Sequence, residues 1–262
     1  MTVQDIYQIL DANAPFSAQE PYDNSGLLVG SPDMDVHHIL LTLDITVPVI
    51  EEAIAAKADL ILSHHPIIWT PLKSLPSEHP VWMLARHNIA AICSHTCLDI
   101  APNGLNTRIG HLLRQKLSFT DTFQPLEILS GDRVLGYTAV LHSEINPGEL
   151  ASALGTLFLP QTLRYYDGGK PIRKIAWCTG SGGDLIETAI ARGADALITG
   201  DCKHSVWVLA QNLGFSLFDC GHFETEVSAT ECFAEYLKQL PDSVQISVSK
   251  AGTTPYFQIL SC

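Results

Sequence analysis

The sequence is poor in charged residues and lacks any apolar run long enough to cross a bilayer. Charged residues make up 16% of the 262 residues, whereas 46% are hydrophobic. An average domain carries about 25% charged residues. A disordered chain would combine low hydrophobicity with a high net charge, so this composition favours a folded core. A membrane helix needs roughly 20 consecutive apolar residues, and their absence predicts a protein that does not span or contact a membrane.

Basic residues are scarcer still, with 15 Lys and Arg against 28 Asp and Glu, which gives a net charge of −13. Non-specific binding to nucleic acid requires a basic face that neutralises phosphates, so such a partner is disfavoured. The first five residues lack the basic start and apolar stretch of a signal peptide. No two of the seven cysteines are separated by only two residues, as in a zinc or redox pair. We therefore expect a cytoplasmic protein with reduced thiols, several of them buried in strands.

Short apolar runs alternate with helical patterns along the chain. The runs 39–43, 60–62 and 89–93 suit buried strands, and 47–57 has the spacing of a helix with one apolar face. Alternation of strand and helix predicts an α/β fold with a mostly parallel sheet flanked by helices.

The second half of the chain repeats the first. Residues 50–63 resemble 186–199 at a constant offset of 136, and the segment His95–Asp99 corresponds to His222–Glu226 at an offset of 127. We interpret this as an internal repeat that produces two similar α/β lobes. The lobes are predicted over 1–123 and 124–240. The tail 241–262, with strands expected at 244–249 and 256–260, could return to the first lobe.

Histidines and carboxylates follow the predicted strands, where ligands bind in open α/β sheets. The six residues that we single out are His64, His65, His95, Asp99, His222 and Glu226. Adjacent histidines at a strand end point to opposite sides, so His64 and His65 would serve two metal ions rather than chelate one. The Glu226 carboxylate could bridge two cations, which favours a dinuclear centre. Nitrogen and oxygen ligands suit zinc, manganese, iron, cobalt or nickel better than calcium or magnesium.

Several alternatives stay open or favour a structural role. His95 could be a ligand, a support for a ligand or a substrate contact. Asp44 also ends a strand, but an acidic residue before a helix is often only an N-cap. The roles of Asp201 and Glu224 are open, and the turn Gly180–Gly183 could be an anion-binding loop or a tight turn. The remaining histidines are expected to be structural or exposed, and they are His37, His38, His79, His87, His111, His142 and His204.

Four segments together resemble the Nif-three-like family, whose members are labelled GTP cyclohydrolase 1 type 2 homologues. They are Asp23–Gly30, Ser63–Pro66, His95–Asp99 and Gly221–Glu226. The stretch Asn103–Asn106 departs from the family pattern. The resemblance implies a two-lobe protomer with a dinuclear metal centre, and a toroidal homohexamer built as a trimer of dimers.

Carried onto this sequence, the resemblance implies two metal positions. One would take His65, Asp99 and Glu226, and the other His64 and His222, with Glu226 bridging. Two cations lower the pKa of water and so create a nucleophile near neutral pH. We therefore expect a metal-dependent hydrolase of a small polar or nucleotide-like substrate, with His95 as the acid or base. The alternative is a non-enzymatic, ring-forming scaffold or regulatory protein that binds metal. The sequence identifies neither the substrate and pathway nor the native metal.

Overall fold

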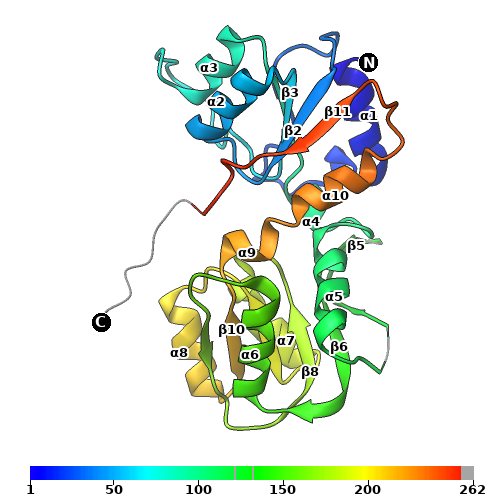
Figure 1. Cartoon of the computed structure of the whole chain (residues 1–262). Coiled ribbons are helices and arrows are strands. Elements are labelled where there is room, and N and C mark those ends of the chain that lie inside the picture. The colour runs from blue at the N-terminus through cyan, green and yellow to red at the C-terminus, as the bar shows by residue number, and fades with distance from the viewer. Residues whose placement is uncertain (121, 132, 255–262) are drawn as a thin grey trace. The chain divides into compact units, whose positions relative to one another are not determined.

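The computed structural model describes residues 1–120, 122–131 and 133–254, and the described chain divides into two compact units. Unit 1 comprises residues 1–101 and 229–254, and unit 2 comprises residues 102–228. Each unit is a β-sheet flanked by helices (Figure 1). The predicted α/β class and the two lobes are therefore confirmed.

Unit 1 is built on a five-stranded sheet with the order β1-β4-β3-β2-β11. Its strands are β1 (Gly26–Val29), β2 (His38–Thr42), β3 (Leu60–Ser63), β4 (Ala90–Cys93) and β11 (Gln245–Val248). Only β1 runs antiparallel to its neighbour, so this sheet is mostly parallel as predicted. The three strands β2, β3 and β4 are buried along their whole length, which explains their uninterrupted apolar sequence.

The helices of unit 1 bury apolar faces against this sheet. They are α1 (Val3–Asn13), α2 (Val47–Ala56), α3 (Pro80–Arg86), the short α4 (Thr96–Asp99) and α10 (Ala229–Tyr236), with a 3₁₀ turn, η1, at Phe16–Ala18. Val49 and Ile50 of α2 pack with Leu40 and Ile61 of the sheet in one buried cluster. This packing fixes the carboxyl ends of β3 and β4, where the predicted metal-binding residues begin.

The chain returns to unit 1 near its C-terminal end. Figure 1 shows β11, coloured orange-red, beside the blue β2 from the start of the chain, and the two strands are parallel. The Glu52 carboxylate holds this return by accepting hydrogen bonds from Ser249 Oγ, at 2.6 Å, and from the backbone N–H groups of Lys250 and Ala251. The strand expected over 244–249 is thus present, and the one expected over 256–260 lies outside the described residues.

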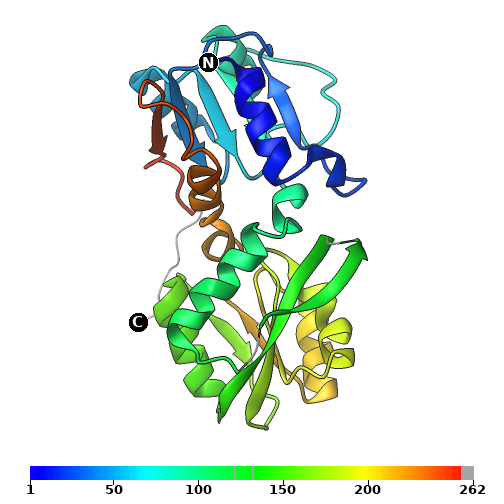
Figure 2. The ribbon, with the colours of Figure 1, turned by 90° about the vertical axis from the view of Figure 1, so that its right-hand side faces the viewer.

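Unit 2 contains a six-stranded mixed sheet with the order β5-β6-β8-β9-β10-β7. Its strands are β5 (Gln124–Ser130), β6 (Arg133–Ile145), β7 (Arg164–Tyr166), β8 (Ile172–Trp177), β9 (Ala196–Thr199) and β10 (Ser216–Asp219). The strands β8, β9 and β10 are parallel, whereas the β5–β6 hairpin and β7 add antiparallel pairs. The prediction of a mostly parallel sheet thus describes the centre of unit 2, and the antiparallel pairing of β5 with β6 makes its edge antiparallel. Figure 2 shows this hairpin as two long green strands.

Helices cover both faces of the unit 2 sheet. They are α5 (Leu105–Lys116), α6 (Pro147–Phe158), α7 (Ile186–Ala191), α8 (His204–Leu213) and α9 (His222–Glu226), with a 3₁₀ turn, η2, at Gly182–Leu185. Trp177 is buried on β8, where it packs with Ile109 and Leu113 of α5. Its indole Nε1 donates a hydrogen bond to the backbone carbonyl of Asn106 at 2.9 Å. The one polar atom of this large buried side chain therefore has a hydrogen-bond partner.

The division between the units differs from the predicted boundaries near residues 123 and 240. Helix α5 belongs to unit 2 because Ile109 and Leu113 lie in its core. Helix α10 belongs to unit 1, and its buried residues include Ala229 and Phe233. A helix joins the sheet against which its apolar face is buried. The sequence pattern of the helix does not show which sheet that is.

The internal repeat is visible as a pair of equivalent hydrogen-bond sets. In unit 1, Asp59 Oδ2 accepts from the backbone N–H groups of His37 and His38, at 2.7 and 3.0 Å. In unit 2, Asp195 Oδ2 accepts from those of Arg173 and Lys174, both at 2.8 Å. All three positions are related by the offset of 136 that the sequence predicts.

The thiols and helices agree with two further expectations within the part of the chain that the structure describes. Six cysteines are free and buried, and they are Cys93, Cys97, Cys178, Cys202, Cys220 and Cys232. Burial raises the pKa of the Cys97 thiol to about 11, which makes it a poor nucleophile at neutral pH. No described helix combines the length and apolar character that crossing a membrane requires.

Candidate metal-binding residues

Three histidines gather at the carboxyl ends of β3 and β4 in unit 1. His64 and His65 directly follow β3, and His95 lies between β4 and α4. One ring nitrogen from each histidine lies within 4.8 Å of the others. The sequence placed these three residues at neighbouring strand ends, and the structure brings them together as predicted.

His64 is completely buried and is held from both sides of its ring. Its Nδ1 lies 2.9 Å from the backbone oxygen of Ser94, and its Nε2 lies 3.7 Å from Oδ1 of Asp99. Asp99 ends α4 and is 9% exposed. A carbonyl acceptor at Nδ1 fixes the proton there, so Nε2 is the nitrogen that could ligate a metal beside the Asp99 carboxylate.

His65 is oriented in the same manner by a carboxylate. Its Nδ1 lies 2.7 Å from Oδ1 of Asp44, which follows β2. The reading of Asp44 as a helix N-cap is wrong, because Thr46 caps α2 by accepting from the backbone N–H of Val49. Asp44 and Ser94 therefore support the two histidines, and the only sequence signal for Asp44 was its place at a strand end.

His95 is fixed by a segment near the start of the chain. Its Nδ1 lies 2.9 Å from Oδ1 of Asp23, and its backbone N–H donates to Ser25 Oγ at 2.9 Å. Asp23 Oδ2 also accepts from the backbone N–H and the hydroxyl of Thr96, at 3.0 and 2.6 Å. The Asp23 side chain is completely buried. Asp23 is not among the six residues that the sequence singles out, although the segment Asp23–Gly30 is among those that carry the family resemblance.

The Asp23 carboxyl stays ionised despite its burial. Desolvation alone would raise its pKa, but hydrogen bonds from His95 and Thr96 and the nearby imidazole act in the opposite direction and lower the pKa well below its ordinary value. An ionised Asp23 fixes the proton of His95 on Nδ1. The other nitrogen, Nε2, is then the one that could exchange a proton with a bound molecule.

Unit 2 carries a histidine and a carboxylate on one short helix. His222 begins α9 and Glu226 ends it, and the four-residue spacing puts both on one helix face. His222 Nε2 lies 2.8 Å from Glu226 Oε2, and His222 Nδ1 lies 2.9 Å from Asp201 Oδ2. Glu226 is 4% exposed. The predicted pair is therefore confirmed as neighbours, and Asp201 acts on His222 as Asp44 acts on His65.

The glycine-rich turn after β8 supports the Glu226 carboxylate. Gly180 has a left-handed backbone with a φ of 59°, and a Cβ atom there would lie 2.0 Å from Glu226 Oε1 and 3.4 Å from His222 Nε2. The Gly180 N–H also donates to Thr225 Oγ1 at 3.1 Å. Of the two roles left open for this turn, the structure shows a tight turn whose missing side chain makes room for Glu226.

Glu224, whose role the sequence leaves open, and two of the remaining histidines have structural or exposed positions. Glu224 Oε2 packs against Gly221, whose φ is 87°, and Glu224 Oε1 accepts from the Gln161 N–H at 3.4 Å. His38 is buried, with its ring nitrogens bonded to the Ala56 carbonyl and to Ser247 Oγ, whereas His37 is exposed. These positions agree with the structural or exposed roles expected of the two histidines.

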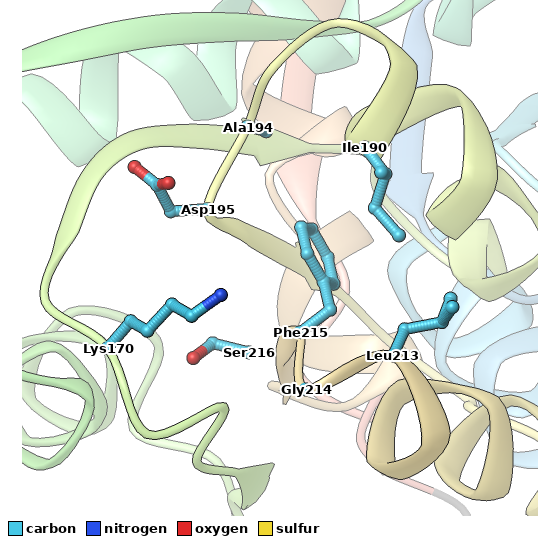
Figure 3. Close-up of a pocket in the computed structure, with 8 residues that line it drawn as sticks. All are labelled: Lys170, Ile190, Ala194, Asp195, Leu213, Gly214, Phe215 and Ser216. Atoms are coloured by element: carbon cyan, nitrogen blue, oxygen red, sulfur yellow. The ribbon is translucent and has the colours of Figure 1, made fainter.

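A pocket of about 230 Å³ lies at the opposite end of the unit 2 strands from His222 and Glu226 (Figure 3). It is formed where the chain enters β9 and β10, by Ala194, Asp195, Gly214, Phe215 and Ser216, with Lys170, Ile190 and Leu213 completing the wall. Figure 3 shows Lys170 extending across the opening toward Phe215. Ligands of open α/β sheets bind at the carboxyl ends of strands, so this pocket does not mark the functional site.

The side chains of each unit form sets suited to a divalent transition metal. Their imidazoles are oriented through Nδ1 by a carbonyl or a carboxylate, as metal-ligating histidines are. Carboxylates lie next to them, and mixed nitrogen and oxygen donors favour zinc, manganese, iron, cobalt or nickel. The fold and these residues thus define an α/β protein of two repeated units, each with candidate ligands for such a metal at the carboxyl ends of its strands.

Comparison with known proteins leads from this class to a family. The family model Duf34/NIF3 (NGG1p interacting factor 3) matches residues 1–255. A protein of Campylobacter jejuni named GTP cyclohydrolase 1 type 2 homolog is 36% identical over 256 residues, covering 95% of this chain and 98% of that protein. The Helicobacter pylori protein named GTP cyclohydrolase 1 type 2 is 30% identical, covering 90% and 91%. The chain belongs to the Duf34/NIF3 family.

Solved structures show the same fold. The hypothetical protein SA1388 of Staphylococcus aureus superposes with a TM-score of 0.87 at 25% identity, covering 99% of both chains. A Bacillus cereus protein related to NIF3 superposes with a TM-score of 0.83 at 20% identity, again over 99% of both chains. The arrangement of two sheets flanked by helices is therefore that of the family.

Proposed function

We propose that this chain binds two divalent metal ions through five side chains and uses them to hydrolyse a small polar or nucleotide-like substrate. The five side chains are His64, His65, Asp99, His222 and Glu226. One observation carries the proposal: the three histidines of this set all have Nδ1 next to an oxygen acceptor, at 2.7 to 2.9 Å. This arrangement selects the tautomer in which Nε2 ligates a metal.

The ligand assignment starts from the family resemblance. The resemblance would give one ion His65, Asp99 and Glu226 and the other His64 and His222, with Glu226 shared. His64 Nε2 lies 3.7 Å from Asp99 Oδ1, so we instead propose that His64 and Asp99 would hold the same ion. The other ion then takes His65 and His222, and Glu226 remains shared. The short helices α4 and α9 each supply one carboxylate, and the repeat accounts for this correspondence between Asp99 and Glu226. Zinc, manganese, iron, cobalt and nickel all accept such nitrogen and oxygen donors.

Divalent ions at this position would lower the pKa of water and polarise the bond to be broken. His95 then moves a proton through Nε2, as general acid or base, while Asp23 holds the proton on Nδ1. Burial of Asp23 keeps water from competing for this hydrogen bond. The proteins named GTP cyclohydrolase 1 type 2 make guanosine triphosphate the first nucleotide to assay.

Metal content tests the binding half of this proposal. Protein purified without chelator should contain about two equivalents of metal per chain by elemental analysis, as a dinuclear site requires. Glu226→Gln and His64→Ala should each lower this content. His204→Ala removes an exposed histidine of α8 and is the matched control. Less than one equivalent in the unsubstituted chain, or unchanged content in Glu226→Gln, would contradict the ligand assignment.

Turnover tests the enzymatic half. Metal-loaded protein is screened against nucleotides, phosphoesters and cyclic amides, and we expect product with at least one class. His95→Ala should lose this activity while retaining metal. Full metal content without turnover, together with specific protein partners in pull-downs, would favour the non-enzymatic scaffold. The toroidal hexamer stays a prediction, which light scattering of the purified protein tests through its mass.

A further inference from the structure

Trp69 presents an unusual surface beside the histidines of unit 1. It lies in the segment between β3 and α3 and is 52% exposed. Its ring centroid is 5.1 Å from that of His95, with the ring planes at 86°, and 6.3 Å from that of His65. About half of this large aromatic residue is therefore open to solvent, directly next to the residue that we assign to proton transfer.

The position of Trp69 is fixed by the same short segment that fixes His95. Asn24 Nδ2 donates a hydrogen bond of 2.6 Å to the backbone carbonyl of Ile68, the residue before Trp69. On either side of Asn24, Asp23 holds the His95 ring and Ser25 accepts from the His95 N–H. Three consecutive residues thus set the relative positions of the imidazole and of the backbone that carries the indole.

Packing below this segment restrains it further. Ile67 and Ile68 pack against the buried cluster formed by α2 and the central strands. The backbone up to Trp69 is therefore tied to the core by apolar contacts and by the Asn24 hydrogen bond. An indole held in this way loses little conformational entropy when a ligand packs on it, which increases the affinity it can contribute.

We propose that Trp69 is a stacking wall of the substrate site, and that it takes a planar unsaturated nitrogen heterocycle of the nucleobase class. An indole face stacks on such rings whatever their identity. The His95 imidazole, roughly perpendicular to that face, can then exchange a hydrogen bond with a nitrogen or oxygen on the ring edge. This inference rests on the proposed function because it places the ring beside the candidate metal ligands.

The surroundings favour a neutral or anionic ring over a cationic ligand. An exposed tryptophan can also bind quaternary ammonium groups through its π face. Here the divalent ions of the proposed centre would lie beside the indole. Their charge would repel a cationic ligand and would attract the phosphates of a nucleotide.

Ligand binding measured by titration calorimetry tests the proposal. The probes are guanosine, adenosine and cytidine 5′-monophosphates, with ribose 5-phosphate as the compound that lacks a planar ring. The proteins are the unsubstituted chain, Trp69→Leu and Trp69→Phe. Trp82→Leu is the matched control, because Trp82 is exposed to a similar degree, at 41%, in helix α3 of the same unit.

We expect Trp69→Leu to weaken nucleotide binding about tenfold or more. Trp69→Phe should restore most of the affinity, and Trp82→Leu should leave it unchanged. Ribose 5-phosphate should bind equally to all four proteins. Nucleotide binding that is absent from the unsubstituted chain, or equal in Trp69→Leu, would overturn the proposal.

Metal analysis of the same samples separates this proposal from the proposed function. Trp69→Leu should keep the metal content of the unsubstituted chain, because Trp69 provides no ligand atom. A chain without bound metal would refute the metal centre, and the calorimetry of that metal-free protein would still decide whether Trp69 stacks on the ring. Each proposal therefore fails on its own measurement.

Discussion

Replacing Gly180 by alanine should displace the Glu226 carboxylate and so impair metal binding. The new Cβ atom would lie 2.0 Å from Glu226 Oε1 and 3.0 Å from its Cδ. An ordinary contact begins at about 3.4 Å, so the carboxylate must shift by about 1.4 Å. Metal–ligand distances tolerate only about 0.2 Å.

The backbone of Gly180 has little freedom to relieve this clash. Its carbonyl accepts from the backbone N–H of Gly200 at 2.8 Å and from Thr199 Oγ1 at 3.0 Å, and its N–H donates to Thr225 Oγ1. The side chain of Glu226 must therefore move instead. Substituting a residue that positions a metal ligand typically costs 10- to 100-fold in metal affinity. Because Gly180 leaves room for Glu226, we expect about this loss for Gly180→Ala.

Gly193→Ala is the matched control for backbone strain. Gly193 also has a left-handed backbone, with a φ of 71°, but a Cβ atom there would have no neighbour within 4 Å. Both substitutions should cost about 1–2 kcal/mol of stability from the left-handed conformation alone, measured by urea unfolding. Zinc affinity, measured by competition with a chromogenic chelator, should fall only in Gly180→Ala. Equal zinc affinity in the two variants would refute the positioning of Glu226 by this turn.

Three further predictions follow from the hydrogen bonds to carboxylates. Asp44→Asn should weaken zinc binding about 10- to 100-fold in the chelator assay, whereas the exposed Asp33→Asn should leave it unchanged. The Asp23 carboxyl has a lowered pKa, so its contribution to stability is full above its ordinary pKa of about 4 and is lost as the pH falls toward the folded-state value. As the pH falls across this range, Asp23→Asn should lose less free energy of unfolding in urea than the unsubstituted chain. An identical loss in both proteins would contradict the assignment. Asp59→Ala and Asp195→Ala should each destabilise their own unit by about 1–3 kcal/mol, and hydrogen exchange that rises equally in both units would argue against the two equivalent sites.

The sequence predicts the repeated α/β architecture because burial leaves periodic signals. The apolar strands 60–62 and 89–93 and the offset of 136 suffice to place two equivalent strand–helix–strand segments. They do not show which sheet α5 or α10 joins, because an amphipathic helix packs on whichever apolar face the chain brings to it. The antiparallel edge of unit 2 escapes prediction for a related reason, since the sequence pattern of a strand does not show whether its neighbour runs parallel or antiparallel.

The candidate ligands were predictable because they lie next to strand ends, and their supporting residues were not. Asp44 and Asp23 are distant in sequence from His65 and His95, so only the folded chain brings each pair together. Gly180 contributes through the absence of a side chain, which leaves no chemical signal in the sequence. A single sequence thus predicts groups that ligate better than groups that orient them.

Anomalous diffraction from crystals of zinc-loaded protein would show whether the five side chains of the proposed centre hold two metal ions. We expect two peaks per chain that share the Glu226 carboxylate, with His64 and Asp99 at one peak and His65 and His222 at the other. A single peak held by one unit alone, or peaks away from these five side chains, would contradict this expectation.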